Sequence, residues 1–197
     1  MYEIPTSINI DGGNFKIRNN GDYRVILDCF QALDDTELTP TERILASLII
    51  FYQDFTTVAD VYVVNSEKFI KEMYNFFNCG SDNSLGTHTN YKLIDWNTDE
   101  QLICSAINKV AGLEIRSVPY MHWWTFMGYY SAIGESPIST IIHIRDKMIS
   151  GKKLEKYERD FRIKNPQYFV WSTKTVDETE SDRLLKELWN NADNNGG

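Results

Sequence analysis

The sequence has little cysteine, and what it has is poorly placed for disulfide or metal chemistry. Its three cysteines, Cys29, Cys79 and Cys104, are far apart and odd in number. Secreted disulfide frameworks are usually dense and even-numbered, and metal sites usually contain closely spaced Cys or His pairs. We therefore expect reduced, structural thiols in a reducing cytosol, because free cysteine is among the most buried residue types.

Long apolar runs are also missing. No stretch approaches the ~20 consecutive apolar residues of a membrane-spanning helix. Residues 1–5 contain neither a basic segment nor an apolar core, so they do not read as a secretory signal peptide. Together these absences predict a cytoplasmic protein with no membrane partner.

Basic residues are fewer than acidic ones in this sequence. The chain has 20 Lys and Arg against 28 Asp and Glu, a net charge of -8, which makes a nucleic-acid partner unlikely because a phosphate backbone attracts cations. One segment differs, since residues 145–164 hold eight basic and four acidic residues. That segment could contact RNA, DNA or an acidic protein. It could also be a solvated helical face with ion pairs between residues four apart, the interpretation we favour.

Signatures of catalysis are absent from the sequence pattern. His88, His122 and His143 belong to no recognised metal spacing, and no calcium-loop pattern occurs. Cys79 and His88 lie near each other in sequence, but an activated thiol needs a geometry that proximity along the chain does not supply. Gly12 and Gly13 lack the Lys and Ser/Thr of a phosphate loop, so a hairpin turn explains them. We predict no enzyme, with no catalytic, cofactor-binding or metal residue and no cofactor.

The residues that are present predict a folded, mainly α-helical protein. Apolar residues make up 42% of the chain and aromatic residues 13%, enough to offset the entropy of folding. Alternating apolar residues around a Gly-rich turn predict an N-terminal β-hairpin over 8–17. Apolar residues at helical spacing and capping signals then predict six to seven helices, which include 23–33, 40–52, 66–77, 98–111, 119–133 and 137–148.

The helix starts carry specific expectations. Thr39 and Glu42 form one predicted capping box, and Thr98 and Gln101 form a second. Pro119 is expected to open a helix that Gly134 ends, and the pair 136–137 is expected to open the next. The segment 58–64 fits a strand or a loop equally well, and 91–96 reads as a short extended piece.

We predict one helical domain over 1–170, with a flexible loop near 78–90 that is rich in Gly, Ser, Asn and Thr. After it, 171–197 reads as an amphipathic helix and a disordered tail. That helix contains Leu184, Leu185, Leu188 and Trp189. A helix of this length is marginal alone in water, so it would dock on its own domain or on another protein.

The adjacent pair Trp123 and Trp124 is the most unusual local feature. Neighbouring helical residues point about 100° apart, so the two rings rarely share one pocket. We expect one of them in the core, packed with Tyr120 and Met127, and the other at its rim or at an interface.

Several short blocks follow one another in a recognisable order. They are residues 8–12, 22–25, 38–43, 76–80, Trp96, 120–126, Ser139, 144–145 and 152–157. In this order the chain resembles the phage gp-fifteen family of siphophages and Gram-positive prophages, over about residues 3–170. The block around His122, Trp123 and Trp124 is the most specific part of the resemblance.

The resemblance implies a role in tail assembly. Members of the family are usually encoded between the tail-tube protein and the tape-measure protein, and proteins in that position resemble tail-assembly chaperones. Such a chaperone would bind and solubilise the tape-measure protein in the bacterial host cytoplasm, and would also associate with itself. The family supplies no catalytic residues to carry over. Alternatives are a structural component, such as a minor tail or head–tail connector protein, and a nucleic-acid-binding regulator that uses 145–164.

Overall fold

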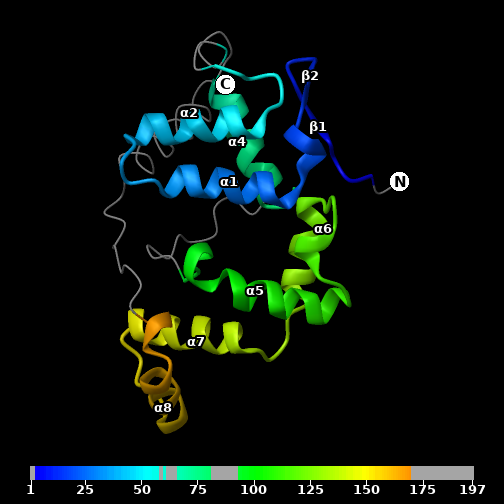
Figure 1. Cartoon of the computed structure of the whole chain (residues 1–197). Helices are drawn as coiled ribbons and strands as arrows, with labels where there is room; N and C mark the ends of the chain where they lie inside the picture. The colour runs from blue at the N-terminus through cyan, green and yellow to red at the C-terminus, as the bar shows by residue number, and fades with distance from the viewer. Residues whose placement is uncertain (1–2, 58–59, 61–65, 81–92, 170–197) are drawn as a thin grey trace, which may run out of the picture. The chain divides into compact units, whose positions relative to one another are not determined.

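The computed structural model describes residues 3–57, 60, 66–80 and 93–169 of the 197-residue chain. Over these residues the protein has seven α-helices and one two-stranded antiparallel sheet (Figure 1). The predicted fold class, mainly α with a small N-terminal hairpin, is therefore confirmed. The predicted C-terminal helix, the segment 58–64 apart from Asp60, and most of the loop near 78–90 lie outside the described residues.

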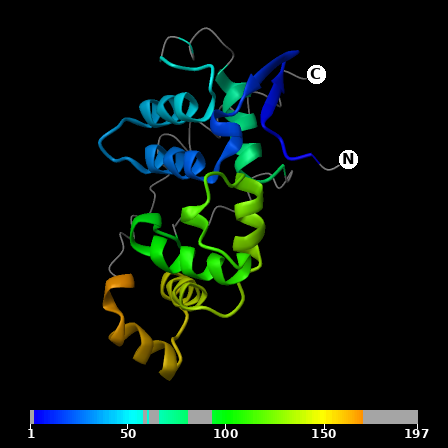
Figure 2. The same cartoon turned by 45° about the vertical axis from the view of Figure 1, so that its right-hand side comes forward.

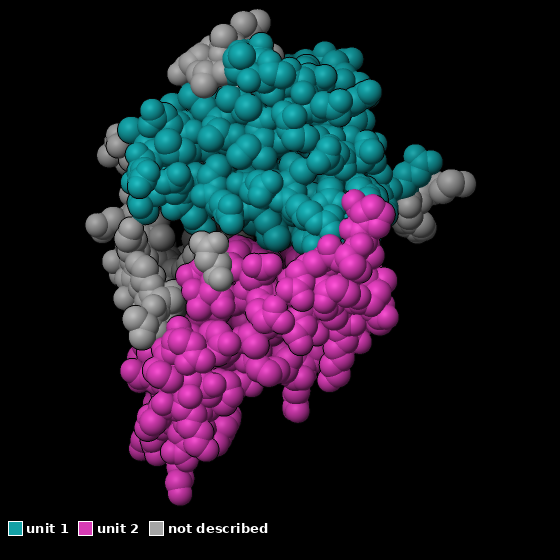
Figure 3. Space-filling view, viewed as in Figure 1, with its two compact units in different colours: residues 1–84, 120–125, 178–197 teal, residues 85–119, 126–177 magenta. Residues whose placement is uncertain are grey.

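The chain divides into two compact units, which Figure 3 colours separately. Unit 1 comprises 1–84, 120–125 and 178–197, and unit 2 comprises 85–119 and 126–177. Each unit is described by itself below. The expectation of a single helical domain over 1–170 stays a prediction.

The hairpin of unit 1 joins β1 (Ser7–Ile10) to β2 (Gly13–Lys16). The strands pair in a register that sets Ile8 opposite Phe15. The two turn residues, Asp11 and Gly12, have φ angles of 52° and 84°, as a two-residue hairpin turn of the primed type requires. The predicted hairpin is confirmed, and its turn is tighter than the Gly-rich stretch suggested.

Among the described residues, three whole α-helices belong to unit 1 besides the hairpin. They are α1 Tyr23–Asp34, α2 Pro40–Phe51 and α4 Ser66–Phe77. Figures 1 and 2 both show α1 and α2 side by side. The capping box of α2 forms as predicted: Thr39 Oγ1 accepts the Glu42 N–H at 3.4 Å, and the Glu42 carboxylate accepts the Thr39 N–H at 2.8 Å. The hydroxyl of Ser47 on α2 donates to the Cys29 carbonyl of α1 at 3.0 Å.

The core of unit 1 is rich in aromatic rings. Phe51 meets Tyr52, Phe76 and Phe77 with ring centroids 4.8 to 5.6 Å apart, in edge-to-face geometry. Such pairs add about 0.5–1.5 kcal/mol each beyond the burial of their area. Phe51 is the last residue of α2 and Tyr52 directly follows it, whereas Phe76 and Phe77 belong to α4. The contacts between these rings therefore hold α2 and α4 together.

Unit 2 is built from the helices that follow. They are α5 Trp96–Ala111, α6 Trp123–Ser131 (its first three residues belong to unit 1), α7 Pro137–Ile149 and α8 Lys156–Lys164. The capping of α7 by Ser136, followed by Pro137, is as predicted, with Ser139 as the reciprocal partner. The buried apolar side chains of this unit include Ile103, Ile107, Ile115, Phe126, Ile138, Ile141 and Ile144.

The predicted capping box of Thr98 and Gln101 is wrong, because α5 begins at Trp96. The Asp95 carboxylate accepts the Thr98 backbone N–H at 3.4 Å, while Asp99 accepts the Asp95 N–H at 2.9 Å. A charged carboxylate accepts more strongly than a hydroxyl. Asp95 therefore has the capping role expected for Thr98, and Asp99 has the reciprocal role expected for Gln101. Gln101 instead accepts a hydrogen bond from Arg116.

The helix predicted to open at Pro119 and to run to Gly134 is shorter at both ends, since α6 spans Trp123–Ser131. The three residues before it are held by tertiary contacts in unit 1. Met121 N–H donates to the Asp22 carboxylate at 3.0 Å, and Tyr23 N–H donates to the Met121 carbonyl at 2.9 Å. These bonds hold the backbone at Met121 and leave the start of the helix to His122, whose Nδ1 accepts the Trp124 N–H.

Candidate interaction surface

His122 has a structural role in unit 1. Its Nδ1 accepts the Trp124 backbone N–H at 3.0 Å, and its Nε2 lies 3.0 Å from the Pro5 carbonyl oxygen. Since Nδ1 accepts, the proton sits on Nε2 and the ring is neutral. Burial lowers the pKa of His122 below its ordinary value, which agrees with this neutral form. The side chain caps α6 and ties it to the N-terminal segment.

The two tryptophans divide as predicted into one core and one rim residue. Trp123 is 2% exposed, packs against Phe30, and donates its Nε1–H to the Phe77 carbonyl at 2.9 Å. Trp124 is half-buried and donates to the Phe76 carbonyl at 3.0 Å. Tyr120, predicted for the same core, is instead 46% exposed. The adjacent aromatic pair is thus part of the scaffold of unit 1.

The cysteines show no sign of activation. Burial raises the thiol pKa of Cys29, Cys79 and Cys104, whereas a nucleophilic thiol needs a lowered pKa. All three are free. His88, the imagined partner of Cys79, lies outside the described residues.

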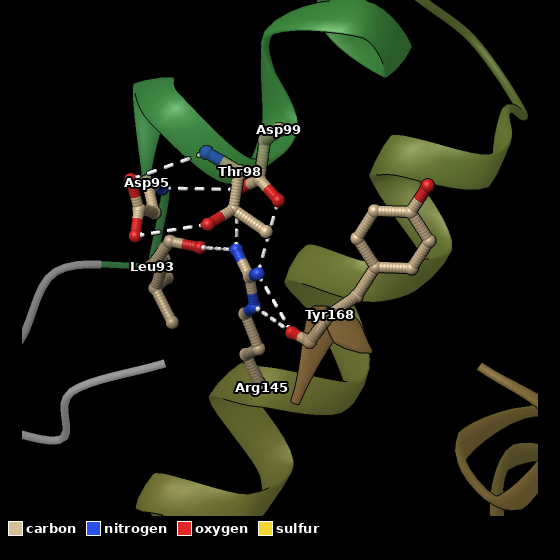
Figure 4. Close-up of polar contacts among 6 residues, drawn as sticks. All are labelled: Leu93, Asp95, Thr98, Asp99, Arg145 and Tyr168. Atoms are coloured by element: carbon tan, nitrogen blue, oxygen red, sulfur yellow. Dashed lines mark hydrogen bonds and ion pairs between the residues drawn. The ribbon is translucent and has the colours of Figure 1, made fainter. Parts of the chain in front are cut away.

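Arg145, predicted as the start of a basic surface, is buried inside unit 2 (Figure 4). Its guanidinium forms a bidentate ion pair with the Asp99 carboxylate, in which Nη1 and Nη2 donate to the two carboxylate oxygens at 2.5 and 3.0 Å. It also donates to the Leu93 carbonyl at 2.8 Å, and twice to the Tyr168 carbonyl at 3.0 and 2.7 Å. These five hydrogen bonds use the five N–H donors of the guanidinium. Because Arg145 belongs to α7 and its partners include Asp99 of α5 and Tyr168, the side chain links α7 to α5 and to the segment after α8.

A second buried charge lies where α7 meets α8. The Glu158 carboxylate is inaccessible to solvent, and its Oε1 lies 2.6 Å from Lys147 Nζ and 3.2 Å from His143 Nε2. The hydrogen bond from Lys147 lowers the pKa of Glu158, and the same bond raises the pKa of Lys147. Lys147 is therefore committed to an internal pair, and His143 lies on the solvent side of it, 56% exposed.

The remaining basic residues of the segment are exposed on and beside α8. They are Lys152, Lys153, Lys156, Arg159, Arg162 and Lys164. Two large apolar side chains stand among them, Tyr157 at 63% and Ile163 at 75% exposure. Ile163 lines a groove of about 340 Å³ together with Arg159, Arg162, Pro166 and Phe169. We call this groove the α8 surface.

The predicted solvated face is present on α8, where the basic residues are exposed. The predicted ion pairs between residues four apart are not what the segment shows, because Lys147 pairs with Glu158 and Lys152 with Asp146. Arg145 is buried in an ion pair with Asp99. A pairing of residues 46 positions apart in sequence, such as Arg145 with Asp99, leaves no local signal that spacing could detect.

The family model described as Bacteriophage Gp15 protein matches residues 1–169. Because the match covers most of the chain, the protein belongs to this family, which confirms the resemblance. No curated protein and no solved structure matches the chain. Membership indicates a bacteriophage protein with a structural or assembly role.

The described residues contain neither a metal-binding cluster nor a membrane-spanning helix. Within these residues, no group of three or more His, Cys, Asp and Glu side chains could hold a metal ion. None of the helices in the same ranges has both the length and the apolar character needed to cross a membrane.

Proposed function

We propose that this protein is a non-catalytic tail-assembly chaperone that binds the tape-measure protein of its phage and keeps it soluble until the tail tube forms. The observation that carries the proposal is membership of the Gp15 family over residues 1–169. The exposed apolar residues of the α8 surface support it, because a chaperone must offer apolar area to its client. The net charge of -8 supports solubility.

The proposal extends to the setting of the protein. It would act in the host cytoplasm, associate with itself, and bind neither membrane nor nucleic acid. The internal pairing of Arg145 and Lys147 weakens the alternative of a nucleic-acid regulator, since two of the eight cations of that segment are taken up inside unit 2.

The test combines co-purification with analysis of the virion. The chain is co-expressed with the tape-measure protein of the same phage, only the latter is tagged, and the eluate is quantified. In parallel, purified particles are analysed by mass spectrometry. Stoichiometric co-elution together with absence from finished particles is the expected result. Retention in the particles without co-elution would instead favour a minor tail or head–tail connector protein.

A further inference from the structure

The α8 surface combines exposed apolar side chains with basic ones on a short helix. Ile163 is the most exposed large apolar side chain among the residues that the structure describes, at 75%. Single exposed apolar residues are common. Here, however, Ile163 lines a groove together with Pro166 and Phe169. The exposed apolar side chain is therefore part of a concave surface that a partner can fill.

The charge around this groove is mainly positive. Arg159 and Arg162 line it directly, and exposed Lys156 and Lys164 lie on the same helix. The acids nearby offset only part of this charge. Glu158 is buried against Lys147, and exposed Asp160 and Glu155 remain. A partner that fits must therefore carry apolar side chains with carboxylates beside them.

We infer that the α8 surface is the docking site for an amphipathic helix of the client, one whose apolar face is bordered by Asp and Glu. This inference rests on the proposed function, because it locates client binding. Helix-in-groove recognition uses apolar anchors spaced along one helical face, and flanking arginines pair well with carboxylates. A nucleic acid would use the cations but not the groove or Ile163.

The experiment measures binding of full-length variants to the tape-measure protein by co-elution and by titration at two salt concentrations. The test variants are Ile163→Ser and the double variant Arg159→Glu with Arg162→Glu. The control is Val110→Ser with Leu113→Ser, which removes two apolar side chains, 38% and 40% exposed, near the end of α5. Thermal melts check that every variant folds, as expected for changes of exposed residues.

We expect each test variant to bind the tape-measure protein at least about tenfold more weakly, which is about 1.4 kcal/mol, and the control to bind like wild type. Wild-type affinity should also fall as salt rises, because the charges are exposed. If wild type binds and the test variants bind equally well, the α8 inference is wrong and the proposed function stands. If wild type does not bind at all, the proposed function fails and the inference with it.

Two further outcomes would identify another occupant of the α8 surface. The test variants could lose affinity for a labelled DNA duplex while their binding to the tape-measure protein is unchanged. They could instead convert a wild-type oligomer to monomer in light scattering, again with unchanged client binding. The first result would assign the surface to nucleic acid and the second to a second copy of the chain, and either would overturn the inference.

Discussion

The two units are stabilised by different chemistry. In unit 1 the centre is aromatic, and two of its buried polar side chains, Asp22 and His122, form hydrogen bonds with the backbone where α1 and α6 begin. In unit 2 the centre contains the ion pair of Arg145 with Asp99, in which neither side chain is exposed. An apolar interior shows itself as periodicity in the sequence. In an ionic interior the paired residues can lie far apart in the sequence, as Arg145 and Asp99 do. Each of them therefore looks like an ordinary surface charge when only the sequence is considered.

The largest effect should come from breaking the ionic centre of unit 2. Arg145→Ala leaves the Asp99 carboxylate buried without its partner and removes the donors to the carbonyls of Leu93 and Tyr168. We expect the free energy of unfolding to fall by about 3–5 kcal/mol, towards the upper end. Urea denaturation measures it, with Lys152→Ala as the exposed control. If Arg145→Ala were as mild as Lys152→Ala, the ionic account of unit 2 would be wrong.

The matching change in unit 1 removes an aromatic anchor. Trp123→Ala should lower the free energy of unfolding by at least about 3 kcal/mol, because the ring is buried and its Nε1–H is bonded to Phe77. Trp124→Ala should cost clearly less, since that ring is only half-buried. Thermal melts of both variants, with the Phe substitution at each position as a milder comparison, test this order. Equal losses would remove the distinction between core and rim.

Gly21 in unit 1 is closely surrounded by side chains, whereas Gly112 in unit 2 faces open space. Gly21 and Gly112 both have positive φ, 77° and 69°, so alanine is strained at either site. A Cβ at Gly21 would lie 2.9 Å from the Phe76 ring and 3.0 Å from His122, whereas a Cβ at Gly112 would meet nothing within 4 Å. We expect losses of about 2–3 kcal/mol for Gly21→Ala and about 1–2 kcal/mol for Gly112→Ala. Chemical denaturation checks the difference, which should vanish if the contacts at Gly21 relax freely.

The smallest effects should appear in the dependence on pH. The pKa of His122 is lower in the folded than in the unfolded chain, where it is about 6.5. Unfolding then takes up a proton, so the stability that His122 contributes is lost as pH falls below about 6.5. The pKa of Glu158 is lowered below 4.5, so its contribution is lost only at more acidic pH, as pH falls through its folded value.

Denaturation between pH 7 and 5 should therefore show a slope that His122→Gln reduces and Glu158→Gln leaves in place. Wild type is the reference, because His143 lies 3.2 Å from Glu158 and its replacement would change a second group. An unchanged slope in His122→Gln would mean that His122 is not held neutral in the fold.

The sequence predicted those parts of the fold that local physics determines. The hairpin follows from alternating residues and a Gly-containing turn. The start of α2 follows from a capping box confined to Thr39–Glu42, and α4 has the predicted bounds. That Trp123 and Trp124 divide into one core and one rim residue follows from helical geometry, but which of them is buried does not.

The parts that sequence reasoning missed depend on distant contacts. The Asp22 carboxylate accepts a hydrogen bond from the backbone N–H of Met121, 99 residues away, and α6 therefore begins later in the sequence than predicted. Asp99 neutralises Arg145 and removes it from the basic surface. The groove beside α8 needs Phe169 and Ile163 in one place, which helical spacing within Lys156–Lys164 does not indicate.

The most direct test of the chaperone account is the solubility of the tape-measure protein. Its soluble fraction after centrifugation is measured when it is expressed alone, with this chain, and with the Arg159→Glu, Arg162→Glu double variant. The account predicts an insoluble client alone, a soluble client with the wild-type chain, and a clear loss of solubility with the double variant. A tape-measure protein that stays equally insoluble with the wild-type chain, or that is soluble without it, would contradict the account.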